Sequence, residues 1–179
     1  MTLKERYHKE IMPTLKKELG FQNALSVPRP TSITVAVGLS QGQKDSKILE
    51  VAEQTLTRIT GQKPVTTKAK KSVAGFKIRE GMIVGMRVTV RGDRMWNFLE
   101  KLLSVTFPRV RDFRGISPKI VDRSGNISIG FREFLPFPEI SPDEVERVHG
   151  LQVTVTTSAK DRASGLALLT ALGFPFQGK

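Results

Sequence analysis

The chain has 179 residues and a formal net charge of +12, with 29 Lys or Arg against 17 Asp or Glu, and a pI near 10.3. Such an excess of positive charge favours a polyanionic partner, either nucleic acid or an anionic membrane surface. The absence of cysteine excludes disulfide bonds and thiolate metal sites and fits a reducing compartment.

Two further observations indicate where the protein works. No apolar run approaches the roughly 20 residues that a membrane-spanning helix needs. The first twelve residues mix acids with bases and lack an apolar core, so we expect neither a signal nor a transit peptide. A cytoplasmic protein without a membrane partner is the expectation.

The first third of the chain predicts helix, strand and helix. Apolar residues recur every four positions from Leu3 to Leu19, which predicts a helix that ends at Gly20 and is kinked or restarted at Pro13. Residues 33–37 alternate between apolar and small or polar side chains, as a half-buried strand does. After a loop over 38–44, a helix capped by Asp45 or Ser46 is expected to run through Ile59.

The middle of the chain predicts two strands around a long connection. A short edge strand is expected over 64–68 and a longer one over 86–90, where Met, Val and Val alternate with Arg and Thr. The roughly 15 residues between them contain glycines at 75, 81 and 85, and a loop of that length is more often functional than incidental. Asp93 is expected to cap the next helix, whose apolar face is Trp96, Leu99, Leu102 and Leu103.

The last third predicts two more strands and a helix. Alternation at 127–131 and at 151–156 predicts the strands, which flank a segment punctuated by three prolines. Asp161 is expected to cap a Leu/Ala-rich helix that ends at Gly173. We predict a single α+β domain over 1–179, with an antiparallel sheet, helices packed on one face and a long basic loop. The open face would carry Thr34, Arg87, Thr89, Arg91, Gln152, Thr154 and Thr156.

The stretch from Gly61 to Arg94 holds +7 of the net charge of +12 in about a fifth of the length. Self-repulsion of this kind does not stabilise a fold, and phosphate backbones are the commonest reason to keep it. Threonines and one phenylalanine among the cations add hydrogen-bonding groups and a stacking ring. A solvated surface that keeps the protein soluble is the plainer alternative, but solubility needs no such clustering of cations and acids would serve it better. Membrane binding is disfavoured because the cations lie on no amphipathic helix. We interpret the stretch as an RNA-binding surface.

A second basic cluster runs from Pro108 to Gly115, with alternating arginines around one phenylalanine. Two interpretations fit it equally well. It could be the end of a helix whose arginine side chains extend to solvent, or an exposed loop that binds RNA or a protein. The residue pattern leaves both open.

Features of enzymes are weak in this chain. The segment from Gly38 to Ser46 superficially resembles a phosphate-binding loop, but its glycine and lysine spacing does not fit that motif. His8 and His149, the two histidines, have no partner at metal-ligand spacing. No nucleophile elbow or acid–base pair of carboxylates stands out. We predict neither catalysis, metal nor cofactor, and a phosphate-handling enzyme is kept only as an alternative.

Several segments in order along the chain resemble the 5S-rRNA-binding protein family of the large ribosomal subunit. They are Glu10–Pro13, Val27–Arg29, Ile59–Pro64, Thr67–Lys77, Arg79–Met82, Val88–Arg91, Pro108–Gly115, Phe137–Ile140 and Gly173–Phe176. The resemblance covers nearly the whole chain.

This resemblance implies a structural protein of the cytoplasmic ribosome that binds 5S rRNA and anchors the central protuberance. The implied partners are 5S rRNA, 23S-type rRNA, P-site tRNA and neighbouring ribosomal proteins, including one in the small-subunit head. Contacts to 5S rRNA are expected from Gln62, Lys63, Thr66, Lys68, Phe76, Arg87, Thr89 and Arg91. The loop facing tRNA is expected to use Lys70, Lys71, Ser72, Phe76, Lys77 and Arg79, and the inter-subunit bridge loop Arg109, Arg111, Asp112, Phe113 and Arg114.

The chain departs from the family pattern at three places. Ala36 stands where an asparagine is usual, the segment Val121–Gly125 lacks a usual phenylalanine and one glycine, and the last helix lacks an acidic run. One side-chain contact to RNA is therefore expected to be missing or replaced. An RNA chaperone outside the ribosome is the alternative within the same broad class.

Overall fold

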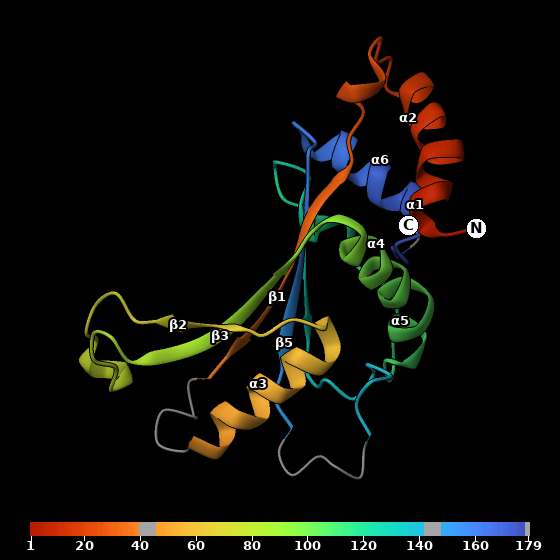
Figure 1. Cartoon of the computed structure of the whole chain (residues 1–179). Coiled ribbons are helices and arrows are strands. Elements are labelled where there is room, and N and C mark those ends of the chain that lie inside the picture. Colours follow the sequence, from red (N-terminus) through yellow and green to blue (C-terminus); the bar gives the residue numbers. More distant parts are fainter. Residues whose placement is uncertain (40–45, 142–147, 178–179) are drawn as a thin grey trace. The chain divides into compact units, whose positions relative to one another are not determined.

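A computed structural model describes residues 1–39, 46–141 and 148–177 of the chain (Figure 1). Its sheet has five strands in the order β2-β3-β1-β5-β4 and is antiparallel, as expected from the alternating strand patterns. The strands are β1 (Pro30–Gly38), β2 (Val65–Lys68), β3 (Ile83–Val90), β4 (Ile127–Phe131) and β5 (Leu151–Thr157). The α+β fold class is therefore confirmed.

The helices follow the 3.6-residue patterns of the sequence. The α-helices are α1 (Leu3–Arg6), α2 (Met12–Glu18), α3 (Ser46–Thr60), α4 (Gly92–Lys101), α5 (Phe107–Arg109) and α6 (Arg162–Leu172). Two π-helical turns, η1 (Tyr7–Ile11) and η5 (Leu102–Thr106), continue α1 and α4, and short 3₁₀ turns lie at η2 (Ala24–Ser26), η4 (Ala74–Phe76) and η6 (Pro118–Ile120). The predicted loop over 38–44, Asp45 as a helix cap and Pro142 lie largely or wholly outside the described residues.

The kink predicted at Pro13 takes the form of a π-helical turn. Proline lacks the N–H that an α-helix needs, and in η1 the N–H of Met12 bonds to the carbonyl of Tyr7, five residues back. The same arrangement recurs before Pro108, where the N–H of Phe107 bonds to the carbonyl of Leu102. Each proline is thus the second residue of a new α-helical segment that follows one widened turn.

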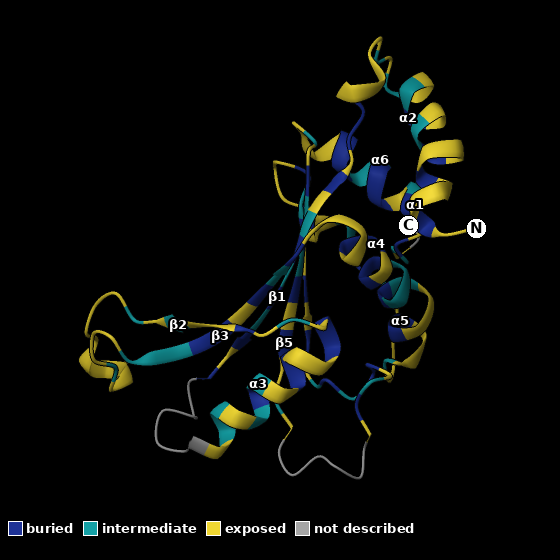
Figure 2. Cartoon of the chain, viewed as in Figure 1, coloured by how far each residue is buried: buried dark blue, intermediate teal, exposed yellow. Residues whose placement is uncertain are grey.

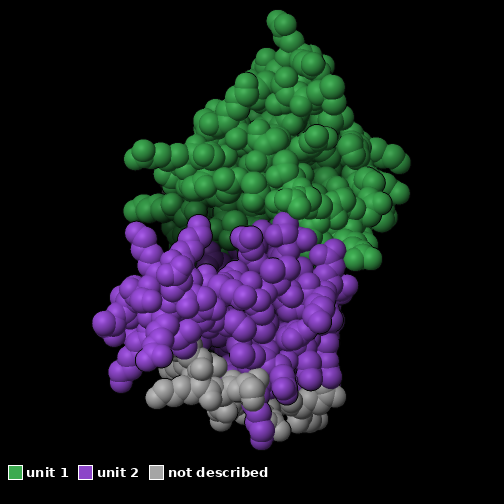
Figure 3. All heavy atoms as spheres, turned by 60° about the vertical axis from the view of Figure 1, so that its left-hand side comes forward, with its two compact units in different colours: residues 1–33, 90–129, 154–179 green, residues 34–89, 130–153 purple. Residues whose placement is uncertain are grey.

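The chain divides into two compact units, each assembled from separate segments (Figure 3). Unit 1 comprises Met1–Ile33, Val90–Ile129 and Thr154–Lys179, and unit 2 comprises Thr34–Thr89 and Gly130–Val153. Neither unit is a continuous stretch of sequence, and a single domain over 1–179 stays a prediction.

The core of unit 2 lies between α3 and one side of its strands. Ala52, Leu56 and Ile59 form the buried stripe of α3, four or three residues apart (Figure 2). The strand residues that the period-2 pattern turns inward are buried as well: Val35, Val37, Met86, Val88, Leu151 and Val153. An aromatic pair, Phe131 and Phe137, extends this core with ring centroids 5.6 Å apart. The opposite side of these strands is left to the polar residues.

The core of unit 1 contains the apolar faces of the N-terminal helix, α4 and α6. Leu3, Tyr7, Ile11 and Leu15 are all buried, which confirms the four-residue pattern. Tyr7 packs against Trp96 with ring centroids 5.2 Å apart and donates its hydroxyl to the carbonyl of Pro28. The buried face of α4 also includes Met95 and Phe98, which the sequence pattern did not single out, whereas Leu103 is only half-buried.

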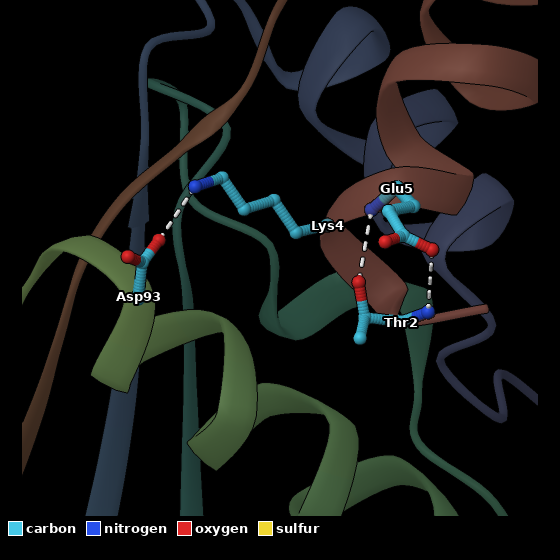
Figure 4. A network of polar contacts seen from close by, with 4 residues as sticks. All are labelled: Thr2, Lys4, Glu5 and Asp93. Atoms are coloured by element: carbon cyan, nitrogen blue, oxygen red, sulfur yellow. Dashed lines mark hydrogen bonds and ion pairs between the residues drawn. The ribbon is translucent and has the colours of Figure 1, made fainter.

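The prediction that Asp93 caps α4 is wrong. The helix begins at Gly92 and the preceding Arg91 is its cap residue, without a side-chain hydrogen bond. Asp93 instead lies in the first turn, where its carboxylate accepts from Lys4 Nζ at 2.6 Å (Figure 4). Beside this ion pair, Thr2 and Glu5 form a reciprocal capping box at the start of α1. At α6 the expected caps are confirmed: Asp161 accepts from the N–H of Ser164 at 2.7 Å, and Gly173 ends the helix with φ +97°.

Candidate nucleic-acid interface

Arg87 projects from β3 on the side of the sheet away from the buried side chains. Strand β2 pairs with β3 so that Val65 lies opposite Arg87 and Thr67 opposite Gly85. Residues directly opposite one another in an antiparallel pair turn their side chains to the same face. Arg87, Thr89, Val65 and Thr67 therefore share one face of this two-stranded ribbon.

Two residues expected to join Arg87 in binding RNA lie elsewhere. Thr66 is opposite Met86, whose side chain is buried, so Thr66 belongs to the other face of β2. Lys68 lies beyond a shift of register, opposite Ile83. Both side chains are exposed at the edge of the sheet, but neither continues the row that Arg87 begins.

The open face of unit 2 extends from this ribbon across β1 to β5. Thr34 and Thr89 have hydroxyl oxygens 3.4 Å apart and share a hydrogen bond. A hollow of about 450 Å³ lies over the same strands, and its lining includes Ala36, Gly38, Thr67, Gly85, Arg87, Gly150 and Gln152. The hollow exists because small residues line it, and Arg87 and Gln152 supply polar groups at its wall.

Gly85 belongs to β3, so its assignment to the preceding connection is wrong. A methyl group at this position would lie 2.5 Å from the carbonyl oxygen of Val37 and 3.1 Å from Thr67 Oγ1. The three strands approach one another too closely here for any side chain. This glycine therefore serves packing within the sheet and supplies no hinge to the loop.

Gln62 and Lys63 follow the end of α3. The N–H of Gln62 donates to Thr60 Oγ1 at 3.3 Å, and its side chain is half-buried. Lys63 Nζ lies 3.4 Å from Glu53 Oε1, in a pair with both side chains well exposed. An exposed ion pair of this kind contributes at most about 1 kcal/mol to stability. Lys63 can therefore leave Glu53 and bind an RNA phosphate at little cost.

The connection between β2 and β3, residues 69–82, is a small hairpin closed by its own hydrogen bonds. Ala69 N–H donates to the carbonyl of Met82 at 2.8 Å, and Gly81 N–H donates to the carbonyl of Ala69 at 3.0 Å. Nearer the tip, Val73 and Ile78 form an antiparallel bridge. We call residues 69–82 the basic hairpin. Most of the hydrogen bonds of its backbone are made within the hairpin, so the exposed side chains are available to an external partner.

The tip of the basic hairpin presents Phe76 to solvent, with 76% of its surface exposed. The turn η4 ends at Lys77, a non-glycine residue in the left-handed region at φ 55°. Ser72 has a structural task, since its Oγ accepts the N–H of Glu80 at 2.9 Å. The cations expected to face tRNA are all exposed: Lys70, Lys71, Lys77 and Arg79. The hairpin therefore collects Phe76 with these cations, away from the residues of the sheet face.

Residues 109–115 of unit 1 form the second basic loop, which we call the arginine loop. Phe113 stacks on the buried Phe107, with centroids 5.3 Å apart and 26° between the rings, and only 36% of it is exposed. Asp112 adopts φ 52°. Arg109, Arg111, Asp112 and Arg114 are exposed. The ring thus anchors the loop while the charged side chains point to solvent, which combines both interpretations that the sequence left open.

The end of the arginine loop is tied to the C-terminal segment. Ile116 N–H donates to the carbonyl of Pro175 at 2.8 Å, and Gln177 N–H donates to the carbonyl of Ile116 at 2.9 Å. Gly115 has φ +90°, and a methyl group there would lie 3.0 Å from Gln177 Cγ. The sequence did not indicate this parallel bridge between distant segments.

Arg91 and the polar residues at the other ends of the strands belong to unit 1. Arg91 is exposed directly after β3. Ser128 and Thr154 share a hydrogen bond between hydroxyls 3.0 Å apart, and Thr156 is half-buried on the same strand as Thr154. Ser128, Thr154 and Thr156 carry hydroxyls, so Arg91 supplies the charge among these positions.

Metal-ligand clusters, membrane-spanning helices and shifted pKa values are the remaining features that bear on the interface. In the described ranges, no group of three or more His, Cys, Asp or Glu side chains is placed to hold a metal ion. Within the same ranges, no helix is both long and apolar enough to cross a membrane. Burial lowers the pKa of His149, which packs against Phe134 at 4.5 Å, and burial raises the pKa of Tyr7. Tyr7 is buried and His149 is half-buried, and the nearby positive charge of Arg29 partly opposes the rise in the pKa of Tyr7.

A basic α+β protein with exposed cations and threonines on an open sheet face, and two cationic loops, is a protein that binds RNA. Two family models agree: residues 23–79 match the one described as ribosomal protein L5, and residues 83–176 match the C-terminal part of the same ribosomal family. The large ribosomal subunit protein uL5 of Colwellia psychrerythraea is 51% identical over 177 residues, covering 99% of this chain and 98% of that protein. The uL5 of Desulfatibacillum aliphaticivorans is 51% identical over 176 residues, covering 98% of each chain. The chain belongs to the uL5 family of large-subunit ribosomal proteins.

The family assignment confirms the resemblance found from the sequence. The protein is a structural, non-enzymatic constituent of the ribosome that binds rRNA, and it functions in translation on cytoplasmic ribosomes. The two alternatives, an RNA chaperone outside the ribosome and a phosphate-handling enzyme, are thereby set aside.

Proposed function

We propose that this protein binds 5S rRNA through the open face of unit 2 and so anchors the central protuberance of the large subunit. The carrying observation is the row of Arg87, Thr89 and Thr67 beside a hollow lined by small residues. Cations attract the phosphate backbone and release its counterions, while hydroxyl and amide groups select ribose and base edges. Gln62 and Lys63 add a polar and an exchangeable cationic group at the end of α3.

The basic hairpin is proposed to contact P-site tRNA, and the arginine loop a protein of the small-subunit head. The hairpin supports this role because its cations and Phe76 are exposed on a backbone that needs no further partner. The arginine loop presents three arginines and the carboxylate of Asp112, which suits a protein surface of mixed charge. Binding of 23S-type rRNA completes the proposed set of partners.

Competitive binding of 5S rRNA against tRNA and random RNA across a salt series tests the main proposal. We expect a preference for 5S rRNA at every salt concentration and an affinity that falls steeply as salt increases. Equal affinity for all three RNAs would contradict the proposed function, however steep the salt dependence.

The division of labour between the sheet face and the basic hairpin is tested by Lys70→Glu combined with Lys71→Glu. We expect tRNA-dependent translation to fall about tenfold or more while the affinity for 5S rRNA changes less. The two substitutions replace positive charges that attract tRNA phosphates with negative charges that repel them. The matched control reverses Lys16 and Lys17 on α2. Equal losses in filter binding and in translation would show that the hairpin has no separate partner.

A further inference from the structure

Ser72 lies in the most accessible part of the basic hairpin. Residues 70–77 are exposed without interruption, and Figure 2 shows the loop beyond β2 and β3 mainly in the colour of exposed residues. In the part of the chain that the structure describes, no hydrogen bond between backbone groups involves Lys70, Lys71 or Ser72. These three residues can therefore enter the cleft of another protein without breaking backbone hydrogen bonds of the fold.

The hydroxyl group of Ser72 is only partly used within the protein. Its oxygen accepts the N–H of Glu80 at 2.9 Å, and within the described ranges no hydrogen bond uses its proton. A serine hydroxyl has one proton to donate and two lone pairs to accept with, so one lone pair remains as well. The group is thus exposed, oriented by the hairpin and available for chemical modification.

Two lysines, Lys70 and Lys71, directly precede Ser72 in the sequence. Protein kinases select their substrates partly by the pattern of charges around the hydroxyl group, and preceding lysines suit a kinase whose cleft is acidic. Ser104 lacks this pattern, because it is exposed on η5 but follows two leucines. The lysines therefore set Ser72 apart from an exposed serine of the same chain.

A phosphate on Ser72 would lie among the cations of the basic hairpin. Val73 pairs with Ile78 in an antiparallel bridge, so Ser72 lies opposite Arg79 in the same register. Phosphate oxygens accept strong hydrogen bonds from arginine, lysine and backbone N–H groups, and the N–H of Glu80 already points to Ser72 Oγ. The hairpin can therefore hold such a phosphate with its own groups.

This phosphate would remove most of the net charge of the basic hairpin. Residues 69–82 contain four cations and one acid, Glu80, which gives a net charge of +3. A phosphoserine brings about −2 near neutral pH, so about +1 would remain. Cations that are neutralised within the hairpin no longer attract the phosphates of an RNA.

We propose that Ser72 is a phosphorylation site of a serine kinase that recognises preceding lysines, and that its phosphate releases the basic hairpin from tRNA. In the reaction, Ser72 Oγ bonds to the γ-phosphorus of ATP and the bond from that phosphorus to the β–γ bridging oxygen breaks. ADP leaves, and the hydroxyl proton passes to a base of the kinase. The release of tRNA rests on the proposed function, which assigns tRNA to this hairpin.

Phosphopeptide mass spectrometry tests the modification itself. The full-length protein and its Ser72→Ala variant are incubated with ATP and a soluble extract of the cells that make the protein. We expect phosphate on Ser72 of the wild-type protein and none on Ser104 of either protein. Absence of phosphate from Ser72 would overturn the proposal, and equal phosphorylation of Ser104 would contradict selection by the two lysines.

Matched variants in assembled large subunits test the effect on tRNA. Ser72→Asp adds a negative charge, and Ser72→Asn has nearly the same shape without that charge. Reversal of Lys70 and Lys71 changes four units of charge for an expected tenfold loss, so one unit corresponds to roughly twofold. We expect tRNA-dependent translation to be about twofold lower with Ser72→Asp than with Ser72→Asn, and about threefold lower when phosphoserine is incorporated at position 72.

Two controls separate this charge effect from other causes. Ser104→Asp makes the same change of net charge in unit 1 and should leave translation unchanged. Amide hydrogen exchange at residues 73–80 establishes that the hairpin stays closed in each Ser72 variant. Equal translation with Ser72→Asp and Ser72→Asn, in an assay where the lysine reversal causes its loss, would overturn the switch and leave the proposed function standing. Full activity of the lysine reversal would instead contradict the proposed tRNA contact.

Discussion

The basic hairpin and the arginine loop contain the same kinds of residue, several cations around one phenylalanine, but they use the ring differently. In the hairpin, hydrogen bonds within the loop hold the backbone, and Phe76 is left exposed at 76%. In the arginine loop, Phe113 stacks on Phe107 and the chain is tied to the C-terminal segment. The first ring is available to stack on a base, and the second is used to fix its own loop.

The comparison shows why sequence composition alone left the function of the second loop open. An aromatic residue among arginines is compatible with RNA stacking and with anchoring, and the choice depends on whether a buried ring lies within reach. Phe107 supplies that ring for Phe113. Among the ring contacts of the described residues, none involves Phe76.

The largest difference in stability is expected from a glycine in each loop. Gly115→Ala should lower the free energy of unfolding by about 2 kcal/mol, because φ +90° is strained for alanine and the methyl group meets Gln177. Gly75→Ala should change it by less than about 0.5 kcal/mol, since Gly75 has neither a positive φ nor a neighbour within 4 Å. Urea denaturation measures both, and equal effects would contradict the difference in anchoring.

Removal of each ring should separate stability from binding. Phe113→Ala is expected to cost about 1 to 2 kcal/mol of stability through loss of the stacked pair. Phe76→Ala is expected to leave stability unchanged and to weaken RNA contacts by about 1 to 3 kcal/mol if one base stacks there. Thermal unfolding and RNA binding are measured on both variants. A destabilised Phe76→Ala protein with normal binding would reverse the assignment of the two rings.

The internal order of the basic hairpin is tested at Ser72. Ser72→Ala removes the acceptor for the N–H of Glu80 and should weaken the hairpin locally by about 1 kcal/mol. Faster amide hydrogen exchange at residues 73–80 is the expected result, with exchange in the arginine loop unchanged. Ser72→Thr, which keeps the hydroxyl, is the control. Unchanged exchange in the alanine variant would mean that the backbone bonds alone hold the hairpin.

The smallest effect is expected from acid, and it should be confined to unit 1. Hydrogen bonds from Ser164 lower the pKa of Asp161. Burial, the largest single influence on Asp122, raises its pKa, but hydrogen bonds from Asn126 and Ser124 together outweigh it and the pKa is lowered. A carboxyl group whose pKa is lower in the folded than in the unfolded protein stabilises the fold at pH values above the unfolded pKa of about 3.9. This stabilisation is lost as the pH falls through the folded pKa.

The melting temperature measured between pH 5 and pH 2 tests this effect. Asp161→Asn keeps an acceptor at the cap of α6 without the titrating charge, so its melting temperature should fall less with acid than that of the wild type. An identical pH dependence in the two proteins would exclude a contribution from Asp161.

The secondary structure followed from the sequence wherever one face of an element is buried. The alternation at 86–90 and the four-residue repeat at 3–19 identify β3 and the N-terminal helix because water selects one face for polar residues. Gly85 was misassigned because the sequence does not distinguish a glycine that serves as a hinge from a glycine that lets strands pack closely. Asp93 was misassigned because α4 begins one residue earlier than the pattern indicated, at Gly92, which places Asp93 inside the first turn.

The site was predictable in its charge and less so in its geometry. The cations of the 61–94 stretch are exposed as the composition implied, but which β2 residues accompany Arg87 depends on strand register. Ser72 was assigned to the tRNA-facing group, and its bond to Glu80 N–H depends on the loop closing on itself.

The edge of the sheet at β2 has a consequence for the protein before it meets RNA. An exposed strand edge invites a strand of a second molecule to pair with it, the first step of aggregation. β2 is only four residues long, contains a register shift between Thr67 and Lys68, and ends in that exposed lysine. These features disfavour such pairing, and positive charge on two copies repels. The lysines that draw in an RNA thus also keep newly made, unassembled chains apart from one another.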